Sequence, residues 1–114
     1  MKQVISLKSS REFKRLYKKG KSCVDKNAVL YTRKNGLTYN RLGITVSAKV
    51  GCAVKRNLVR RRIREAYRLS VDEFKKGYDL IYVARVRAAG ASYRSVRQSV
   101  LTLAKNLDLF EGTP

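Results

Sequence analysis

The sequence predicts an α/β (α+β) two-layer sandwich, in which a small central sheet packs against helices. First, helix-like and strand-like hydrophobic patterns follow one another in the order α-β-β-α-β-α. Second, the chain has 114 residues, which is enough for one domain with its own core. Third, a hydrophobic content of 44% is ordinary for a globular protein. We therefore expect residues 1–114 to form a single domain.

The first expected helix begins at Ser9. A serine followed three residues later by a glutamate, here Glu12, is a capping-box pattern, because the two side chains can bond free amide groups at a helix start. Gly20 is suited to end this helix, and we expect a polar loop over residues 21–27. Three side chains share one face of the helix at helical spacing: Phe13, Leu16 and Tyr17.

Three segments have the β-branched and aromatic composition of strands: residues 28–33, 39–47 and 78–86. Successive side chains of a strand point to opposite faces of the sheet, so the first two strands divide into two sets. The side chains that suit a core are Leu30, Leu42, Ile44 and Val46. Those that suit the opposite, more polar face are Val29, Tyr31, Arg33, Arg41, Thr45 and Ser47.

A strongly basic helix is expected over residues 53–69. At roughly 100° per residue, six basic or amide side chains fall within an arc of about 140°; they are Arg56, Asn57, Arg60, Arg61, Arg64 and Arg68. A separate arc is apolar and suits a core: Val59, Ile63, Ala66 and Tyr67. The surrounding segment, from Lys26 to Arg64, has eleven Lys or Arg and no Asp or Glu. Such a concentration of one charge favours a negatively charged partner.

The C-terminal part is expected to hold one more helix. Residues 72–76 read as a short helical extension or loop that Gly77 ends, and residues 88–91 read as a flexible connector. Ser92 can then cap a last helix. Four apolar side chains of that helix keep helical spacing: Val96, Val100, Leu103 and Leu107.

The net charge is +19, from 27 basic and 8 acidic residues, and the pI is near 10.5. This balance is typical of nucleic-acid-binding proteins. A membrane-surface protein can share such a charge, but it normally has an amphipathic helix with a wide, bulky apolar face. We find no apolar run near the roughly 18 residues that span a bilayer, and no signal-peptide pattern in the first residues. We therefore expect a cytoplasmic protein without a membrane partner.

The sequence offers few parts for catalysis by the protein itself. It has no histidine and only two cysteines, Cys23 and Cys52, whereas a zinc site needs about four such ligands. The eight acidic residues are scattered, and no glycine-rich loop resembles a phosphate-binding fingerprint. We therefore predict no catalytic residues and no metal ligands, and we expect both cysteines to be thiols, although one disulfide remains an alternative.

RNA is the favoured nucleic acid. No helix-turn-helix, zinc-finger or zipper pattern appears, and single strands bind to aromatic side chains as well as to cations. Phe13, Tyr17 and Tyr31 are the candidate stacking residues. For Phe13 and Tyr17 core packing is an equally good interpretation, because paired aromatic residues on a helix are often buried.

Residues 41–68, RLGITVSAKVGCAVKRNLVRRRIREAYR, resemble the protein subunit of bacterial ribonuclease P. That family has the signature R-x-G-[ILF]-[ST]-V-S-K-K-x-G-x-A-V-x-R-N-x-x-[KR]-R-x-[IL]-R-E, with Leu42 here in the variable second position. The matching residues are Gly43, Val46, Ser47, Lys49, Gly51, Ala53, Val54, Arg56, Asn57, Arg60, Arg61, Ile63, Arg64 and Glu65. The family pattern F-x-x-[LVI]-[YF]-x-x-G matches residues 13–20, and a V-L-Y strand matches residues 29–31. The resemblance covers residues 7–107.

The resemblance implies a protein subunit of ribonuclease P, the hydrolase that removes the 5′ leader of precursor tRNA. The partners would be the catalytic RNA, one protein per RNA, and precursor tRNA. The RNA, with bound magnesium, would perform the cleavage. The basic helix would cross between parallel strands in the rare left-handed sense.

The resemblance also assigns residues to two surfaces. Contacts to the RNA subunit would come from Lys49, Arg56, Asn57, Arg60, Arg61, Arg64 and Arg68. A cleft between the first helix and the sheet would hold the leader, lined by Phe13, Tyr17, Val29 and Tyr31.

Three positions depart from the family pattern. Leu58 stands where many members have a second arginine, Ala48 replaces the first of two lysines, and Ala28 replaces a common aromatic residue. These differences suggest altered affinity within the same pattern. The alternative function is a structural RNA-binding protein of the ribosomal type, because the same charge could hold ribosomal RNA helices together.

Overall fold

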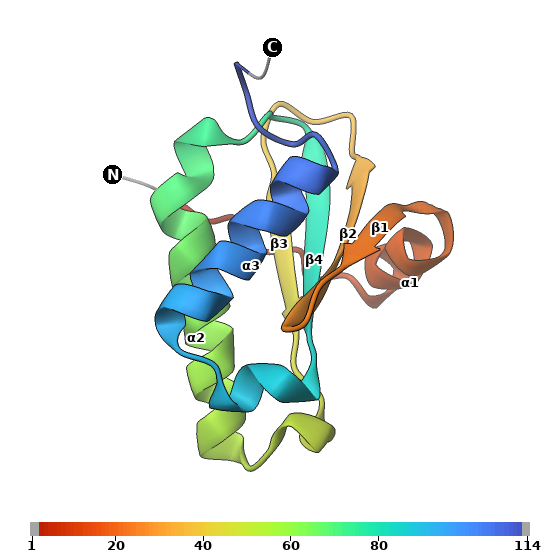
Figure 1. The fold of residues 1–114 in the computed structure, drawn as a ribbon. Helices are drawn as coiled ribbons and strands as arrows, with labels where there is room; N and C mark the ends of the chain where they lie inside the picture. The colour runs from red at the N-terminus through yellow and green to blue at the C-terminus, as the bar shows by residue number, and fades with distance from the viewer. Residues whose placement is uncertain (1–2, 113–114) are drawn as a thin grey trace.

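The computed structural model describes residues 3–112, which form three helices around a four-stranded sheet (Figure 1). The helices are α1 (Ser10–Lys19), α2 (Ala53–Ser70) and α3 (Tyr93–Asn106). The strands are β1 (Lys21–Val24), β2 (Ala28–Lys34), β3 (Arg41–Thr45) and β4 (Tyr78–Ala84). Short 3₁₀ turns η1 (Ala48–Val50), η2 (Val71–Glu73) and η3 (Val86–Gly90) join them. The predicted α+β class is confirmed.

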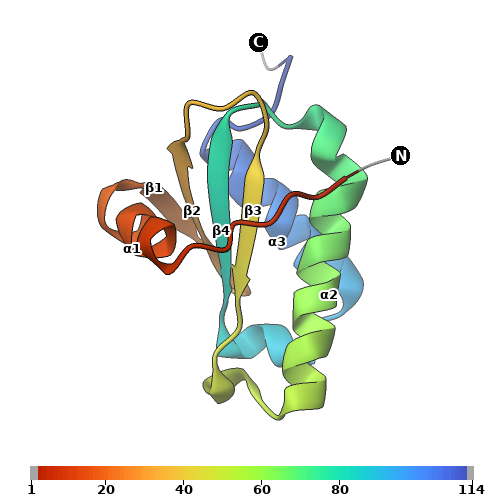
Figure 2. The same ribbon diagram turned by 180° about the vertical axis from the view of Figure 1, so that it is seen from behind.

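The sheet has the strand order β1-β2-β4-β3. Strand β2 pairs antiparallel with both β1 and β4, whereas β3 pairs parallel with β4. The chain leaves β3, runs through α2 and returns as β4, so the expected β-α-β crossover is present (Figures 1 and 2). The N-terminal arm extends the sheet beyond β3, because the Leu7 amide donates to the Leu42 carbonyl over 2.9 Å and the Leu42 amide donates to the Ile5 carbonyl over 2.8 Å.

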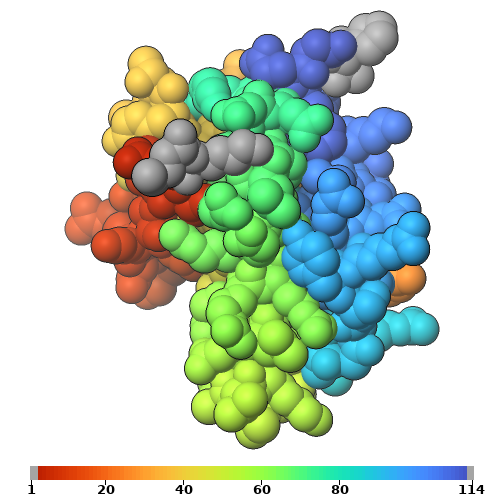
Figure 3. All heavy atoms as spheres, turned by 90° about the vertical axis from the view of Figure 1, so that its left-hand side faces the viewer, coloured from red at the N-terminus to blue at the C-terminus, as the bar shows by residue number. Residues whose placement is uncertain are grey.

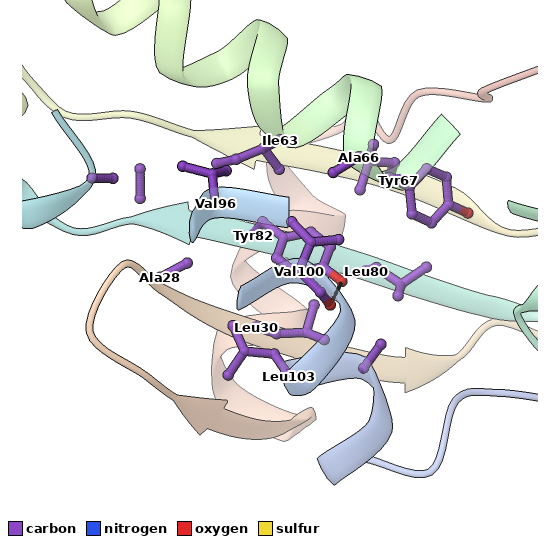
Figure 4. Packing of buried hydrophobic residues seen from close by; sticks show 14 of the residues in the cluster. Ala28, Leu30, Ile63, Ala66, Tyr67, Leu80, Tyr82, Val96, Val100 and Leu103 are labelled. Carbon is purple, nitrogen blue, oxygen red and sulfur yellow. Dashed lines mark hydrogen bonds between the residues drawn. The ribbon is translucent and has the colours of Figure 1, made fainter. Parts of the chain in front are cut away.

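The main core lies between one face of the sheet and helices α2 and α3 (Figure 4). Leu30, Leu80 and Tyr82 point into it from the sheet, and each is fully buried. The Tyr82 hydroxyl donates to the Val100 carbonyl over 2.9 Å, so this ring is fixed at its polar end as well. Burial raises the pKa of Tyr82 well above its ordinary value. The predicted core face of the first two strands is confirmed.

Helix α1 covers the other face of the sheet (Figure 2). Its buried Leu16 packs with Leu7 of the N-terminal arm and Ile81 of β4, and these three residues form a second, smaller core. The serine half of the predicted capping box of α1 is confirmed, since the Ser9 hydroxyl accepts from the Glu12 amide over 3.4 Å, whereas the Glu12 carboxylate pairs with Arg41 instead. The predicted cap of α3 is also confirmed, since the Ser92 hydroxyl accepts from the Ser95 amide over 3.1 Å.

Several predicted boundaries were wrong. Residues 21–27 are not all loop, because Lys21–Val24 forms β1 along the edge of β2. Strand β3 covers Arg41–Thr45 instead of residues 39–47, and β4 ends at Ala84 instead of residue 86. The expected connector at residues 88–91 is largely part of the ordered turn η3.

Gly20 ends α1 as predicted, but with an ordinary extended backbone at φ −77°. The reason for glycine is space. A Cβ at this position would lie 2.6 Å from the Leu16 carbonyl oxygen and 2.9 Å from that of Thr32. The tight passage from α1 into β1 therefore excludes any other residue without a backbone shift.

Candidate nucleic-acid interface

The basic surface is the part of the molecule formed by the cationic side of α2 and the turn before it. We define it by Lys49, Arg56, Asn57, Arg60, Arg61, Arg64 and Arg68. Lys49 lies on η1, and the other six side chains lie on α2. Figure 3 shows the molecule from the side on which α2, in green, is at the surface. The opposite side of α2 is buried in the main core through Val59, Ile63, Ala66, Tyr67 and Ser70. Helix periodicity thus separates the two faces, as the sequence predicted.

Four members of the basic surface are exposed: Lys49, Asn57, Arg61 and Arg64. Arg60 is half-buried and donates to the side-chain Oδ1 of Asn57 over 3.0 Å, which leaves the side-chain Nδ2 of Asn57 free to bind another group. Arg68 is different, because both of its hydrogen bonds go to Glu65, at 3.1 and 2.6 Å. This pair lowers the pKa of Glu65, so Glu65 offsets part of the charge of Arg68.

Arg56 lies at the border between the basic surface and the core. Its Nε atom is buried and has no hydrogen-bond partner within residues 3–112. The turn before α2 depends on Gly51, whose φ of 150° is unfavourable for other residues. A Cβ there would also lie 3.1 Å from the Lys55 side chain. This turn sets where α2 starts and therefore where its arginines point.

The aromatic surface is formed by Phe13 and Tyr17 of α1 with Val29 and Tyr31 of β2. The Tyr17 and Tyr31 rings meet edge to face, with centroids 4.9 Å apart at an interplanar angle of 79°. The Phe13 and Tyr17 rings meet similarly at 6.3 Å and 72°. Tyr17 is 40% exposed and its hydroxyl shares a hydrogen bond of 3.2 Å with the Thr45 hydroxyl of β3. The structure therefore brings Phe13, Tyr17 and Tyr31 together, and Val29 lies on the same face of β2 as Tyr31.

Phe13 serves packing and surface at the same time. It is half-buried against the smaller core, and its ring occupies the space beside Gly43, where a Cβ would lie only 2.5 Å from the ring tip. Leu7, Leu16 and Ile81 fill the space directly between α1 and the sheet. The accessible part of the aromatic surface is therefore the margin of α1 and the uncovered sheet beside it.

An ionic network that the sequence analysis missed joins α1 to the sheet. Asp79 of β4 is only 8% exposed, and both of its oxygens accept from Arg41 of β3 at 2.8 Å. Arg41 also pairs with Glu12 of α1, and Asn35 donates to Asp79 over 2.9 Å. The hydrogen bond and charge of Asp79 raise the pKa of Arg41, so it stays charged. The available signal was one acidic residue inside the apolar strand YDLIYVA.

The three departures from the family pattern have different surroundings. Ala28 is buried in the main core, so this position faces away from the aromatic surface. Ala48 is exposed on η1 next to Lys49. Leu58 is half-buried on α2. Only the last two can change the basic surface directly.

Cys23 and Cys52 are free thiols, so the disulfide alternative is wrong. Across residues 3–112, we find no group of three His, Cys, Asp or Glu side chains arranged to hold a metal ion. None of the helices in that range has both the length and the hydropathy needed to cross a membrane.

The model of the ribonuclease P family matches residues 1–108. The ribonuclease P protein component of Clostridioides difficile (strain 630) is 46% identical over 104 residues, covering 90% of this chain and 91% of the relative. That of Alkaliphilus oremlandii (strain OhILAs) is 41% identical over 112 residues, covering 98% of each chain.

Solved structures agree with these relatives. The ribonuclease P protein of Staphylococcus aureus superposes with a TM-score of 0.88 at 33% identity, covering 96% of this chain and 100% of the other. That of Thermotoga maritima gives 0.82 at 34% identity, covering 89% and 96%. The comparisons favour the ribonuclease P hypothesis over the ribosomal-type alternative. The chain therefore belongs to the ribonuclease P protein family, the RNA-binding protein subunits of a ribonuclease that processes tRNA.

Proposed function

We propose that the basic surface binds the ribonuclease P RNA while the aromatic surface binds the single-stranded 5′ leader of precursor tRNA. One protein molecule would act with one RNA in the cytoplasm, where precursor tRNA is made. The observation that carries this proposal is the separation of the two surfaces. The arginines lie on the outside of α2, and the aromatic rings lie with α1 on the other face of the sheet.

The basic surface suits a structured RNA with many phosphates. Arg61 and Arg64 are exposed, and Arg60 is held in place by Asn57. Arginine can contact two phosphate oxygens at once, and each phosphate contact releases bound counterions. Binding of the RNA subunit should therefore weaken steeply as salt is added.

The aromatic surface suits a flexible single strand. Tyr17 and Tyr31 present ring edges and faces next to the half-buried Val29, and this combination offers stacking without a fixed base sequence. Exposed cations flank these rings along α1, at Lys14, Arg15, Lys18 and Lys19. Base stacking with nearby phosphate contacts is the usual chemistry of single-strand binding.

Cleavage is assigned to the RNA subunit with bound magnesium. The carboxylates next to the aromatic surface, Glu12 and Asp79, both pair with Arg41, so this donor set does not fit a magnesium ion held by the protein. The role of the chain in the reaction is therefore to bind and orient the two RNAs.

The test is reconstitution with a bacterial ribonuclease P RNA and a precursor tRNA. At low magnesium, where RNA phosphates repel one another most, added protein should raise the cleavage rate at the leader junction. A variant with Arg60→Ala and Arg61→Ala should require more protein for the same rate. A wild-type protein that leaves the rate unchanged would refute the proposal. Cleavage by the RNA-free protein would refute the assignment of catalysis to the RNA.

A further inference from the structure

A groove runs between the exposed side of α2 and the start of α3, and we call it the α2–α3 groove. It is lined by Leu58, Arg61, Arg62, Arg64, Glu65 and Tyr93. Figure 3 shows this side of the molecule, with the side chains of α2 next to those of the first turns of α3. The groove continues the basic surface, since Arg61 and Arg64 belong to both.

The charged residues of the groove are not equivalent. Arg62 donates to the Ala91 carbonyl over 2.6 Å, which fixes it to the turn before α3. Glu65 is held by Arg68 at 2.6 Å and leaves the groove little free negative charge. Arg61 and Arg64 are exposed and form no ion pair or side-chain hydrogen bond within residues 3–112. They are one helical turn apart, which makes them neighbours on the helix surface.

The rest of the lining is not charged. Leu58 is half-buried on α2, and the half-buried Tyr93 ring packs against the edge of the main core. The Tyr93 hydroxyl is buried and has no hydrogen-bond partner within residues 3–112. A site for phosphate alone needs only cations and amide donors. An aliphatic and an aromatic side chain in the same groove as two free arginines are instead the combination that binds a base together with its phosphates.

We propose that the α2–α3 groove receives an unpaired nucleobase of the ribonuclease P RNA. The base lies against Leu58 and Tyr93, and the phosphates on either side of it contact Arg61 and Arg64. The inference rests on the proposed function, because it requires the basic surface to bind this RNA. It adds a different kind of contact, since a base is recognised by shape and stacking and a phosphate by charge.

The experiment adds one positive charge at two matched positions and measures affinity for a bacterial ribonuclease P RNA at several salt concentrations. Ala48→Lys adds the charge on η1, outside the groove, where Ala48 is exposed. It should raise the affinity for the RNA. It should also steepen the slope of log affinity against log salt concentration by about 0.9. Leu58→Arg adds the same charge inside the groove and displaces the base. It should lower affinity about tenfold, in spite of the added charge.

A second variant, Leu58→Ala, removes the apolar contact without changing the charge. It should lower affinity severalfold and leave the slope of the salt dependence unchanged. The melting temperature of each variant, taken without RNA, shows whether the fold is intact; Leu58 is half-buried, so little change is expected.

The proposal is overturned if Leu58→Arg binds more tightly, as Ala48→Lys does, or if Leu58→Ala has no effect on affinity. Failure of the proposed function gives a different result. In that case the unmodified protein binds the RNA weakly, and the variant with Arg60→Ala and Arg61→Ala binds no worse. That result would overturn both proposals at once.

Discussion

The basic surface and the aromatic surface are built in opposite ways. The basic surface comes from one helix and the turn before it, over residues 49–68, and needs only a correct helix to point its arginines outward. The aromatic surface combines α1 with β2, and contacts β3 through the Tyr17–Thr45 hydrogen bond. The basic surface depends on the periodicity of one helix, whereas the aromatic surface depends on how α1 packs against the sheet.

This difference predicts how each surface can be damaged. A change on α2 removes one contact and leaves the others in place. Shifting α1 would disturb the aromatic surface as a whole, because Phe13 rests beside Gly43 and Arg41 ties Glu12 to Asp79. Mutations on the basic surface and on the aromatic surface should therefore weaken binding of different RNAs, and they should differ in how much they destabilise the fold.

The largest effect is expected on the basic surface. Changing Arg60 and Arg61 together to alanine should lower affinity for the ribonuclease P RNA by about 10–100-fold and reduce the slope of its salt dependence by about 2, since each phosphate contact contributes about one unit. Filter binding at several salt concentrations measures both quantities. The matched control is Arg94→Ala with Arg97→Ala, which removes the same charge from exposed positions on α3. Equal losses in the two double variants would mean that only net charge matters.

The next effect concerns the leader. Tyr31→Ala should reduce the preference for precursor over mature tRNA by about tenfold, because one stacked base contributes on the order of 1–3 kcal/mol. Binding of the ribonuclease P RNA should stay the same. Tyr39→Ala is the control, since Tyr39 is 41% exposed in the loop before β3, outside the aromatic surface. The two-surface hypothesis would be wrong if Tyr31→Ala weakened binding of precursor tRNA and of the ribonuclease P RNA equally.

A smaller effect is expected when the packing of α1 against the sheet is disturbed. Gly43→Ala puts a Cβ 2.5 Å from the Phe13 ring tip, so the ring and α1 have to move. We expect a loss of about 1–3 kcal/mol in the free energy of unfolding, as for other overpacked sites, together with weaker leader preference. Gly90→Ala is the control, because a Cβ there has no neighbour within 4 Å. Urea unfolding measures stability. An unchanged leader preference in a destabilised Gly43→Ala protein would show that the seating of α1 does not matter for binding.

The sequence predicted those parts that depend on local patterns. The caps at Ser9 and Ser92 and the two faces of α2 all follow from side chains a few positions apart. The alternation of apolar and polar residues also placed Leu30 and Tyr31 on opposite faces of the sheet. Each of these features can be identified without knowledge of any distant contact.

The parts that were missed depend on contacts between distant residues. Strand β1 has the sequence KSCV, which has little strand character, and it is a strand because it pairs with β2. Arg41 and Asp79 are 38 positions apart, and no spacing rule relates them before the parallel pairing of β3 and β4 is known. The α2–α3 groove likewise needs the packing of two helices.

The smallest effect is expected in the reactivity of the two cysteines, of which one adjoins the basic surface and the other does not. Cys52 is exposed at the start of α2, where a backbone hydrogen bond from Lys55 lowers its pKa. Cys23 lies in β1, where its thiol donates to the Leu103 carbonyl of α3 over 3.4 Å and burial raises its pKa.

The thiolate is the reactive form, so Cys52 should be alkylated by iodoacetamide about ten times faster than Cys23 near neutral pH, and its rate should level off at a lower pH. Bound ribonuclease P RNA should slow the alkylation of Cys52 and leave the alkylation rate of Cys23 unchanged, because only Cys52 adjoins the basic surface. A single-stranded leader oligonucleotide should slow the alkylation of neither cysteine. Mass spectrometry of the labelled peptides measures both rates, and Cys52→Ser and Cys23→Ser proteins confirm the assignment of each rate. Strong protection of Cys52 by the leader alone would mean that the leader reaches α2, and the division between the two surfaces would then be incorrect.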